Sequence, residues 1–167
     1  MERYVSRQAS SDTSWFASLY QRQVNTVYRV CFNYLRNPAD TEDAVQTIFT
    51  KLLTNPRSFE SEEHEKAWLI RVAANHCKDI FKSSWSKREN LEDVDEPAAL
   101  QEVFDDTLEL VMALPEPQRV CVYLFYYEGY NAKEIGEMLD KPHSTVRSYL
   151  SEARSALRLS LEEDSDD

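Results

Sequence analysis

Apolar residues recur at three- and four-residue steps along most of this 167-residue chain. That spacing puts them on one face of an α-helix, whereas a half-buried strand would show alternation of apolar and polar residues. The chain has only two glycines, although sheet proteins use glycine at many turns and bulges. We therefore expect an all-α protein.

The apolar pattern of the first half predicts three long helices that pack together as a first domain, residues 13–83. Asn37 is expected to cap the second of these helices through its side chain, with Pro38 at the first helical position. The predicted helices cover residues 13–35, 38–53 and 62–82.

Residues 84–98 are rich in serine and charge and poor in apolar side chains, which predicts a flexible acidic linker. A second small helical domain is expected over residues 99–161. Its first two helices are predicted over residues 98–114 and 117–128, and Gly129 has the position of a C-terminal cap.

The stretch from Asn131 to Leu161 predicts two helices joined by a tight turn, because Pro142 cannot continue the first helix. The second helix begins at His143 or Ser144, and serine is the better cap. This is the helix-turn-helix arrangement, whose second helix enters the DNA major groove. An ordinary helical hairpin buried in a helical domain has the same pattern. In the DNA-binding interpretation the outward residues are His143, Ser144, Thr145, Arg147, Ser148 and Ser151.

A net charge of −11 is unfavourable for nucleic-acid binding, but the acidic residues are segregated. Residues 89–118 and 162–167 hold 15 of the 30 acidic residues and none of the 19 basic ones, so the rest of the chain carries +4. Residues 66–88 have six basic side chains against one carboxylate, a balance of +5. A surface that can face phosphates is therefore available there.

Other chemistry has little support in the sequence. Cys31, Cys77 and Cys121 are scattered through apolar stretches, which suggests reduced thiols in the core and neither a metal site nor a cofactor. No phosphate-binding glycine loop or nucleophile elbow is present, so we do not expect an enzyme. No apolar run has the roughly 18 residues of a membrane span, and the chain begins with polar residues. We expect a cytoplasmic protein that does not insert into membranes.

Three stretches together resemble one protein family. They are YLRNPADTEDAVQTIFTKLL, AWLIRVAANHCKDIFK and, after the linker, LPEPQRVCVYLFYYEGYNAKEIGEMLDKPHSTVRSYLSEAR. In this order and spacing they resemble the extracytoplasmic-function sigma factors, the minimal two-domain transcription initiation factors of bacteria. The resemblance covers residues 15–159 and implies a protein that binds core RNA polymerase, recognises two promoter elements and helps to open the duplex.

The resemblance implies roles for several residues of the first domain. Asp40, Asp43 and Gln46 match the family pattern that docks on the clamp helices of the polymerase β′ subunit, whereas we expect Phe49 of the same pattern to lie in the core. Asn75 matches the asparagine that reads a flipped-out base of the minus-ten element, since an amide can both donate and accept hydrogen bonds. Nearby cations would contact the phosphates of the melted strand. They are Arg71, Lys78 and Lys82.

Trp68 has two interpretations. It can stack on a base of the melted strand, or it can belong to the core with Leu69 and Val72, and helical spacing favours the core.

The resemblance also assigns the minus-thirty-five contacts to the second domain. The matching residues are Ser144, Thr145, Arg147, Ser148, Ser151 and Arg154. Glu152 departs from the family, which commonly has a basic residue there. Its carboxylate would repel phosphate, pair with a neighbouring arginine or accept a hydrogen bond from a cytosine amine.

The implied partners are the β′ clamp helices and β subunit of core polymerase, promoter DNA and an anti-sigma factor. The acidic linker is either a disordered tether or a mimic of nucleic acid in a basic polymerase channel. Two other classes fit the sequence less well. One is a stand-alone helix-turn-helix regulator that dimerises through its first domain, and the other is a protein-interaction adaptor that no longer binds promoters.

Overall fold

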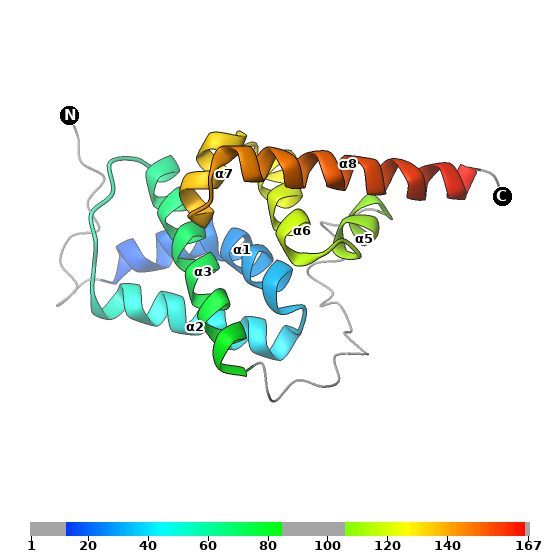
Figure 1. The fold of residues 1–167 in the computed structure, drawn as a ribbon. Coiled ribbons are helices and arrows are strands. Elements are labelled where there is room, and N and C mark those ends of the chain that lie inside the picture. Colours follow the sequence, from blue (N-terminus) through cyan, green and yellow to red (C-terminus); the bar gives the residue numbers. More distant parts are fainter. Residues whose placement is uncertain (1–12, 85–105, 166–167) are drawn as a thin grey trace. The chain divides into compact units, whose positions relative to one another are not determined.

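The computed structural model describes residues 13–84 and 106–165. All regular elements in these two ranges are helices (Figure 1), which confirms the predicted all-α fold. The chain divides into two compact units, residues 1–95 and 96–167. Residues 85–98 of the predicted linker lie outside the described ranges, as do residues 98–105 of the helix predicted over residues 98–114.

The first unit consists of helices α1 (Ser14–Leu35), α2 (Pro38–Thr54) and α3 (Glu62–Ser84). These bounds agree with the predicted ones to within two residues. Each of the three helices packs against the other two. Their buried apolar faces meet in one core, formed mainly by Leu19, Val27, Leu35, Ile48, Leu52, Leu69 and Ile70.

The turn between α1 and α2 takes only two residues. Arg36 ends α1 in the left-handed conformation, with φ of 52°, and its N–H donates to the Phe32 carbonyl at 2.9 Å. The Asn37 side chain then accepts a hydrogen bond from the Asp40 N–H at 3.1 Å, with Pro38 at the first helical position. The predicted cap is confirmed, and it fixes where the face of α2 begins.

A buried carboxylate joins α1 to α3. Glu65 is fully buried, and both of its carboxylate oxygens accept from Nη2 of Arg22 at 3.2 Å. Gln23 Nε2 donates to the same carboxylate at 3.0 Å. Burial raises the pKa of Glu65, while the bonds from Gln23 and Arg22 act against that rise. A charged group in the core is tolerable because its oxygens are paired in this way.

The three cysteines are buried free thiols, as predicted. Cys31 of α1 and Cys77 of α3 are hydrogen-bonded to each other in the first core. That bond and burial together raise the pKa of Cys31 well above its usual value. These thiols therefore act as small core side chains.

The second unit consists of α5 (Asp106–Met112), α6 (Glu116–Val122), α7 (Ala132–Leu139) and α8 (His143–Ser165). Helix α8 packs against both α6 and α7. The buried Arg119 donates to the Leu114 carbonyl at 2.9 Å and closes the turn before α6.

The sequence predicted a single α-helix over residues 117–128, and this was wrong in its second half. Residues Tyr123–Tyr127 form a π-helical segment that continues directly from α6. Gly129 follows with φ of 80°, as expected for a cap, and the Tyr130 N–H donates to the Leu124 carbonyl at 3.0 Å. The periodicity did not reveal the π-helical turn, because a run of apolar and aromatic residues has no polar face to mark it.

Candidate nucleic-acid and protein interfaces

The three predicted docking residues lie along one edge of α2. Asp43 and Gln46 are exposed, and Asp40 is half-buried in the first turn. Steps of three residues turn only about 60° around a helix, so the three side chains lie next to one another. We name Asp40, Asp43 and Gln46 the α2 docking edge. Phe49, in contrast, is buried against Tyr20 at a centroid distance of 4.9 Å, so its predicted place in the core is confirmed.

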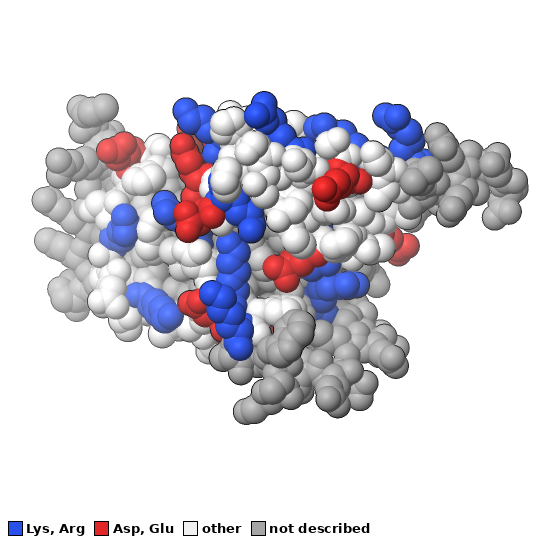
Figure 2. All heavy atoms as spheres, viewed as in Figure 1, with Lys and Arg blue, Asp and Glu red and all other residues white. Residues whose placement is uncertain are grey.

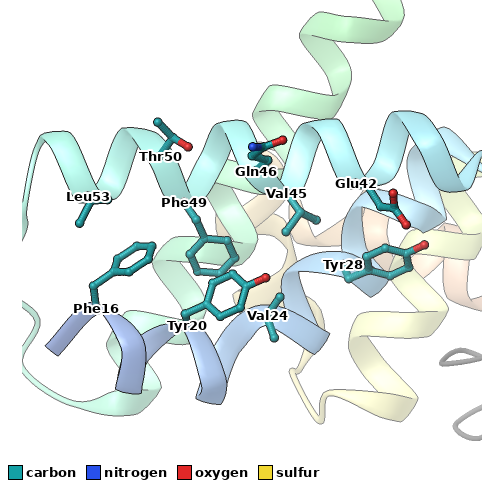
Figure 3. Close-up of a pocket in the computed structure, with 10 residues that line it drawn as sticks. All are labelled: Phe16, Tyr20, Val24, Tyr28, Glu42, Val45, Gln46, Phe49, Thr50 and Leu53. Carbon is teal, nitrogen blue, oxygen red and sulfur yellow. The ribbon is translucent and has the colours of Figure 1, made fainter. Parts of the chain in front are cut away.

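An apolar groove of about 430 Å³ lies between α1 and α2, beside the docking edge. Figure 3 shows Phe16, Tyr20 and Phe49 gathered at one end of it, with Gln46 on α2 above the groove. Tyr28 lies at the other end, where burial and then the Glu42 carboxylate raise its pKa. This groove could not be predicted from the sequence, because the same periodicity describes a fully covered helix face.

The predicted minus-ten residues share one face of α3. Arg71, Asn75 and Lys82 are exposed and Lys78 is half-buried. Successive steps of four, three and four residues keep their side chains within an arc of about 60°. Figure 2 shows basic side chains gathered over α3. We name Arg71, Asn75, Lys78 and Lys82 the α3 basic face.

Small residues line the core-facing side of α3. Ala73, Ala74 and Cys77 are fully buried against the core, so the helix cannot rotate without exposing them. The α3 basic face is therefore held outward by packing, independently of any ligand.

Trp68 of α3 contacts side chains of the loop that precedes the helix. Its ring is half-buried, 5.4 Å from the ring of Phe59, and the Arg57 guanidinium lies 4.8 Å from its centroid. These contacts agree with the packing interpretation of Trp68. They also place the positive charge of Arg57 beside the first turns of α3.

In the helix-turn-helix, a capping box begins α7 and a residue in the left-handed conformation ends it. Asn131 accepts from the Glu134 N–H at 2.9 Å, and the Glu134 carboxylate accepts from the Asn131 N–H at 3.1 Å. At the other end of α7, Asp140 has φ of 56°, and the Lys141 N–H donates to the Gly136 carbonyl at 2.9 Å. The sequence pattern contained this capping box, and we did not predict it.

Gly136 lets the turn approach α7. A Cβ at this position would lie 2.6 Å from the Lys141 carbonyl oxygen, closer than two such atoms can come. Helix α8 then begins at His143, one of the two predicted starts. The Pro142 carbonyl accepts from the N–H groups of Thr145 and Val146 at 3.0 and 3.2 Å. The alternative, a Ser144 cap, was wrong, because Ser144 already lies within the first helical turn.

Most of the predicted minus-thirty-five residues are exposed on α8. Thr145 is half-buried, and the exposed members are Ser144, Arg147, Ser148, Ser151 and Arg154. Val146, Leu150 and Ala153 are buried on the opposite side and hold the helix on α6 and α7. The structure thus brings the hydroxyl groups and Arg147 together at the first turns of α8.

Arg154 is exposed but held by the π-helical segment. Its Nε donates to the Tyr126 hydroxyl at 2.7 Å, and its guanidinium lies 5.6 Å from the centroid of Phe125. The π-helical turn positions both aromatic rings for this contact. Contacts between residues 28 positions apart are beyond what helical periodicity can predict.

Glu152 accepts a hydrogen bond from Gln118 Nε2 at 2.9 Å. Among the described residues the partner of Glu152 is thus a neutral amide on α6, and not the neighbouring arginine that was one of the expected alternatives. The side chain of Glu152 remains exposed.

Comparisons with known proteins agree with this architecture. The family model described as Sigma-70 region 2 matches residues 19–87, and the model described as Sigma-70, region 4 matches residues 104–157. The sigma factor SigW of Bacillus subtilis is 24% identical, over 96% of each chain. The sigma-E factor of Haemophilus influenzae is 29% identical, over 92% of this chain and 90% of its own.

Solved structures share the fold. The sigma factor RpoE of Bartonella quintana, in complex with the anti-sigma factor NepR, matches with a TM-score of 0.70 at 20% identity, over 90% of this chain and 98% of its own. CnrH in complex with the cytosolic domain of CnrY matches with a TM-score of 0.62 at 19% identity, over 93% of both chains.

The two helical units, each matched by its own sigma-70 region, define a promoter-specificity factor for RNA polymerase. More particularly, the chain belongs to the extracytoplasmic-function sigma factors, and it directs RNA polymerase to promoters. Proteins of this family are transcription initiation factors that work as part of the polymerase. In the part of the chain that the structure describes, no helix has the length and apolar character needed to cross a membrane.

Proposed function

We propose that the α2 docking edge binds the β′ clamp helices, that the α3 basic face binds the melted minus-ten strand, and that the outer face of α8 binds the minus-thirty-five element. The observation that carries this proposal is the α3 basic face, which combines three cations and a base-reading amide within about 60° of one helix. The chain then works in the cytoplasm, where it binds both β′ and β of core polymerase. Run-off transcription with core polymerase on genomic fragments tests the whole proposal and returns the promoter sequence.

An anti-sigma factor is the second proposed partner. The sigma factor RpoE, which shares this fold at a TM-score of 0.70, was solved in complex with the anti-sigma factor NepR. The apolar groove beside the α2 docking edge supports this proposal, since a protein bound there would cover Gln46 and block polymerase docking.

Charge reversal at the docking edge is expected to weaken polymerase binding. An acidic edge favours a basic partner surface, so Asp43→Arg converts attraction into repulsion and should lower the affinity for core polymerase about tenfold. Asp43 is exposed, so the first unit should remain folded. The measurement is a titration of labelled protein with core polymerase. Glu63→Arg, an equal charge reversal at another exposed site of the same unit, is the control. Equal affinities of Asp43→Arg and wild type would contradict the assignment.

Asn75→Ala is expected to remove discrimination at one base of the minus-ten element, because alanine cannot hydrogen-bond a flipped base edge. We expect the preference at that base to fall about tenfold while the affinity for core polymerase stays the same. Run-off transcription across single-base promoter variants measures the preference. Asn25→Ala, at an exposed asparagine of α1, is the matched control. An unchanged preference in Asn75→Ala would exclude base reading by this residue.

A further inference from the structure

The geometry points to a base-reading pair formed by Gln118 and Glu152. In this inference, which rests on the proposed binding of α8 to the minus-thirty-five element, the Glu152 carboxylate accepts a hydrogen bond from the N4 amine of a cytosine. Gln118 acts as a positioning residue that holds the carboxylate in place.

The position of Glu152 on α8 is the first observation. At about 100° per residue, Glu152 lies about 40° to one side of Ser148, and Ser144 lies about 40° to the other. All three side chains are exposed, and the buried residues Val146, Leu150 and Ala153 lie on the opposite side of the helix. If the hydroxyl face of α8 enters the major groove, Glu152 enters with it.

The distribution of charge on α8 is the second observation. Arg147, Arg154 and Arg158 are exposed along one flank, about 80–120° from Ser148 and away from Glu152. Figure 2 shows basic side chains along α8. The arginine flank can follow a phosphate backbone while the carboxylate faces the floor of the groove, where it is farther from phosphate. Segregation of this kind removes the electrostatic objection to an acidic residue on a recognition helix.

The hydrogen-bond donors of the major groove then limit which bases Glu152 can recognise. An ionised carboxylate only accepts hydrogen bonds, and the major groove offers base donors only on the amino groups of cytosine and adenine. Glutamate reading the cytosine amine is the usual pairing. Adenine would also present its N7 acceptor to the carboxylate, which is repulsive, so cytosine is favoured.

Gln118 holds the Glu152 carboxylate in position without neutralising it, because an amide has no charge. Its Nε2 donates to Glu152 Oε2 at 2.9 Å, which leaves Oε1 available for the base. Gln118 is half-buried on α6, and α6 packs against α8, so the amide is attached to a fixed element. An arginine in its place would form an ion pair with the carboxylate and compete with the weaker cytosine donor.

The test is run-off transcription by the full chain with core polymerase, on promoters that carry each single-base change through the minus-thirty-five element. We expect wild type to prefer cytosine at one position by about fivefold to tenfold. Glu152→Ala should lose that preference, and Glu152→Gln should move it towards adenine, because glutamine matches the donor and acceptor of adenine. Gln118→Ala should keep cytosine with a smaller preference at the same position.

Glu109→Gln is the control, since it removes an equal charge from an exposed site on α5 and should leave the base profile unchanged. If Glu152→Ala and Glu152→Gln keep the wild-type base profile, the pair is only a surface hydrogen bond and the inference is wrong. If wild type directs transcription from promoters and the Glu152 variants have the same base profile as wild type, only this inference is overturned. Failure of wild type to direct transcription from any promoter overturns the proposed function as well. Circular dichroism of each variant checks that α8 is intact.

Discussion

Gly136→Ala is expected to destabilise the second unit by about 2 kcal/mol, although the same change in an ordinary helix stabilises by about 1 kcal/mol. The reason is the position of the turn after α7, which would bring the new Cβ to 2.6 Å from the Lys141 carbonyl oxygen. Backbone cannot move aside as a flexible side chain can. The strain must therefore open the turn between α7 and α8 or shift α8 itself.

Urea unfolding followed by circular dichroism measures this loss. All three tryptophans lie in residues 1–95, so tryptophan fluorescence follows the first unit and should not change in Gly136→Ala. Gly129→Ala is the matched control, because its φ of 80° is unfavourable for alanine but no atom lies within 4 Å of the new Cβ. We expect it to lose about 1 kcal/mol. A Gly136→Ala protein more stable than wild type would show that the turn adapts freely.

Glu65→Ala is expected to destabilise the first unit by about 3 kcal/mol. The substitution leaves a cavity and removes the acceptor for Arg22 and Gln23, which are bonded to the carboxylate at 3.2 and 3.0 Å. Arg22 keeps a contact with Glu62 at 3.6 Å, so its charge is not left wholly unpaired. Tryptophan fluorescence during urea unfolding measures this loss, and the unfolding of the second unit is the internal control.

Glu65 also makes the stability of the first unit depend on pH, in a direction set by its pKa shift. Burial raises the pKa of Glu65 in the folded state above its usual value of 4.5. Between these two pKa values the folded state binds more protons than the unfolded state, so the contribution of Glu65 to stability falls as pH rises through that window. Below pH 4.5 the contribution is fully present. In Glu65→Gln this part of the pH dependence should vanish, and an unchanged slope would contradict the shift.

The order and bounds of the helices could be predicted because they depend on local information. Asn37 and Pro38 carry the signals of a helix start in their own chemistry, and Gly129 carries that of a helix end. The α3 basic face followed from spacing together with the buried residues behind it. In each case the relevant atoms belong to residues a few positions apart.

What the sequence did not reveal depends on distant partners. Glu65 has the pattern of a charged residue in the first turn of a helix, and only the packing of α1 against α3 makes it a buried acceptor. Glu152 meets Gln118 across 34 positions of sequence. Gly136 is important because of a carbonyl five residues away, beyond a turn whose path helical spacing does not describe.

The α3 basic face has a fixed length. From Arg71 to Lys82 the helix rises about 16 Å, at about 1.5 Å per residue. In a stacked strand each nucleotide advances about 3.4 Å along the axis, so this face matches the length of about five stacked nucleotides. Because the helix is held rigid by the alanines and cysteine behind it, the face cannot lengthen to follow a longer stretch. In the proposed function, the length of α3 therefore limits how much of a melted strand the α3 basic face can contact at once, whatever the sequence of the promoter.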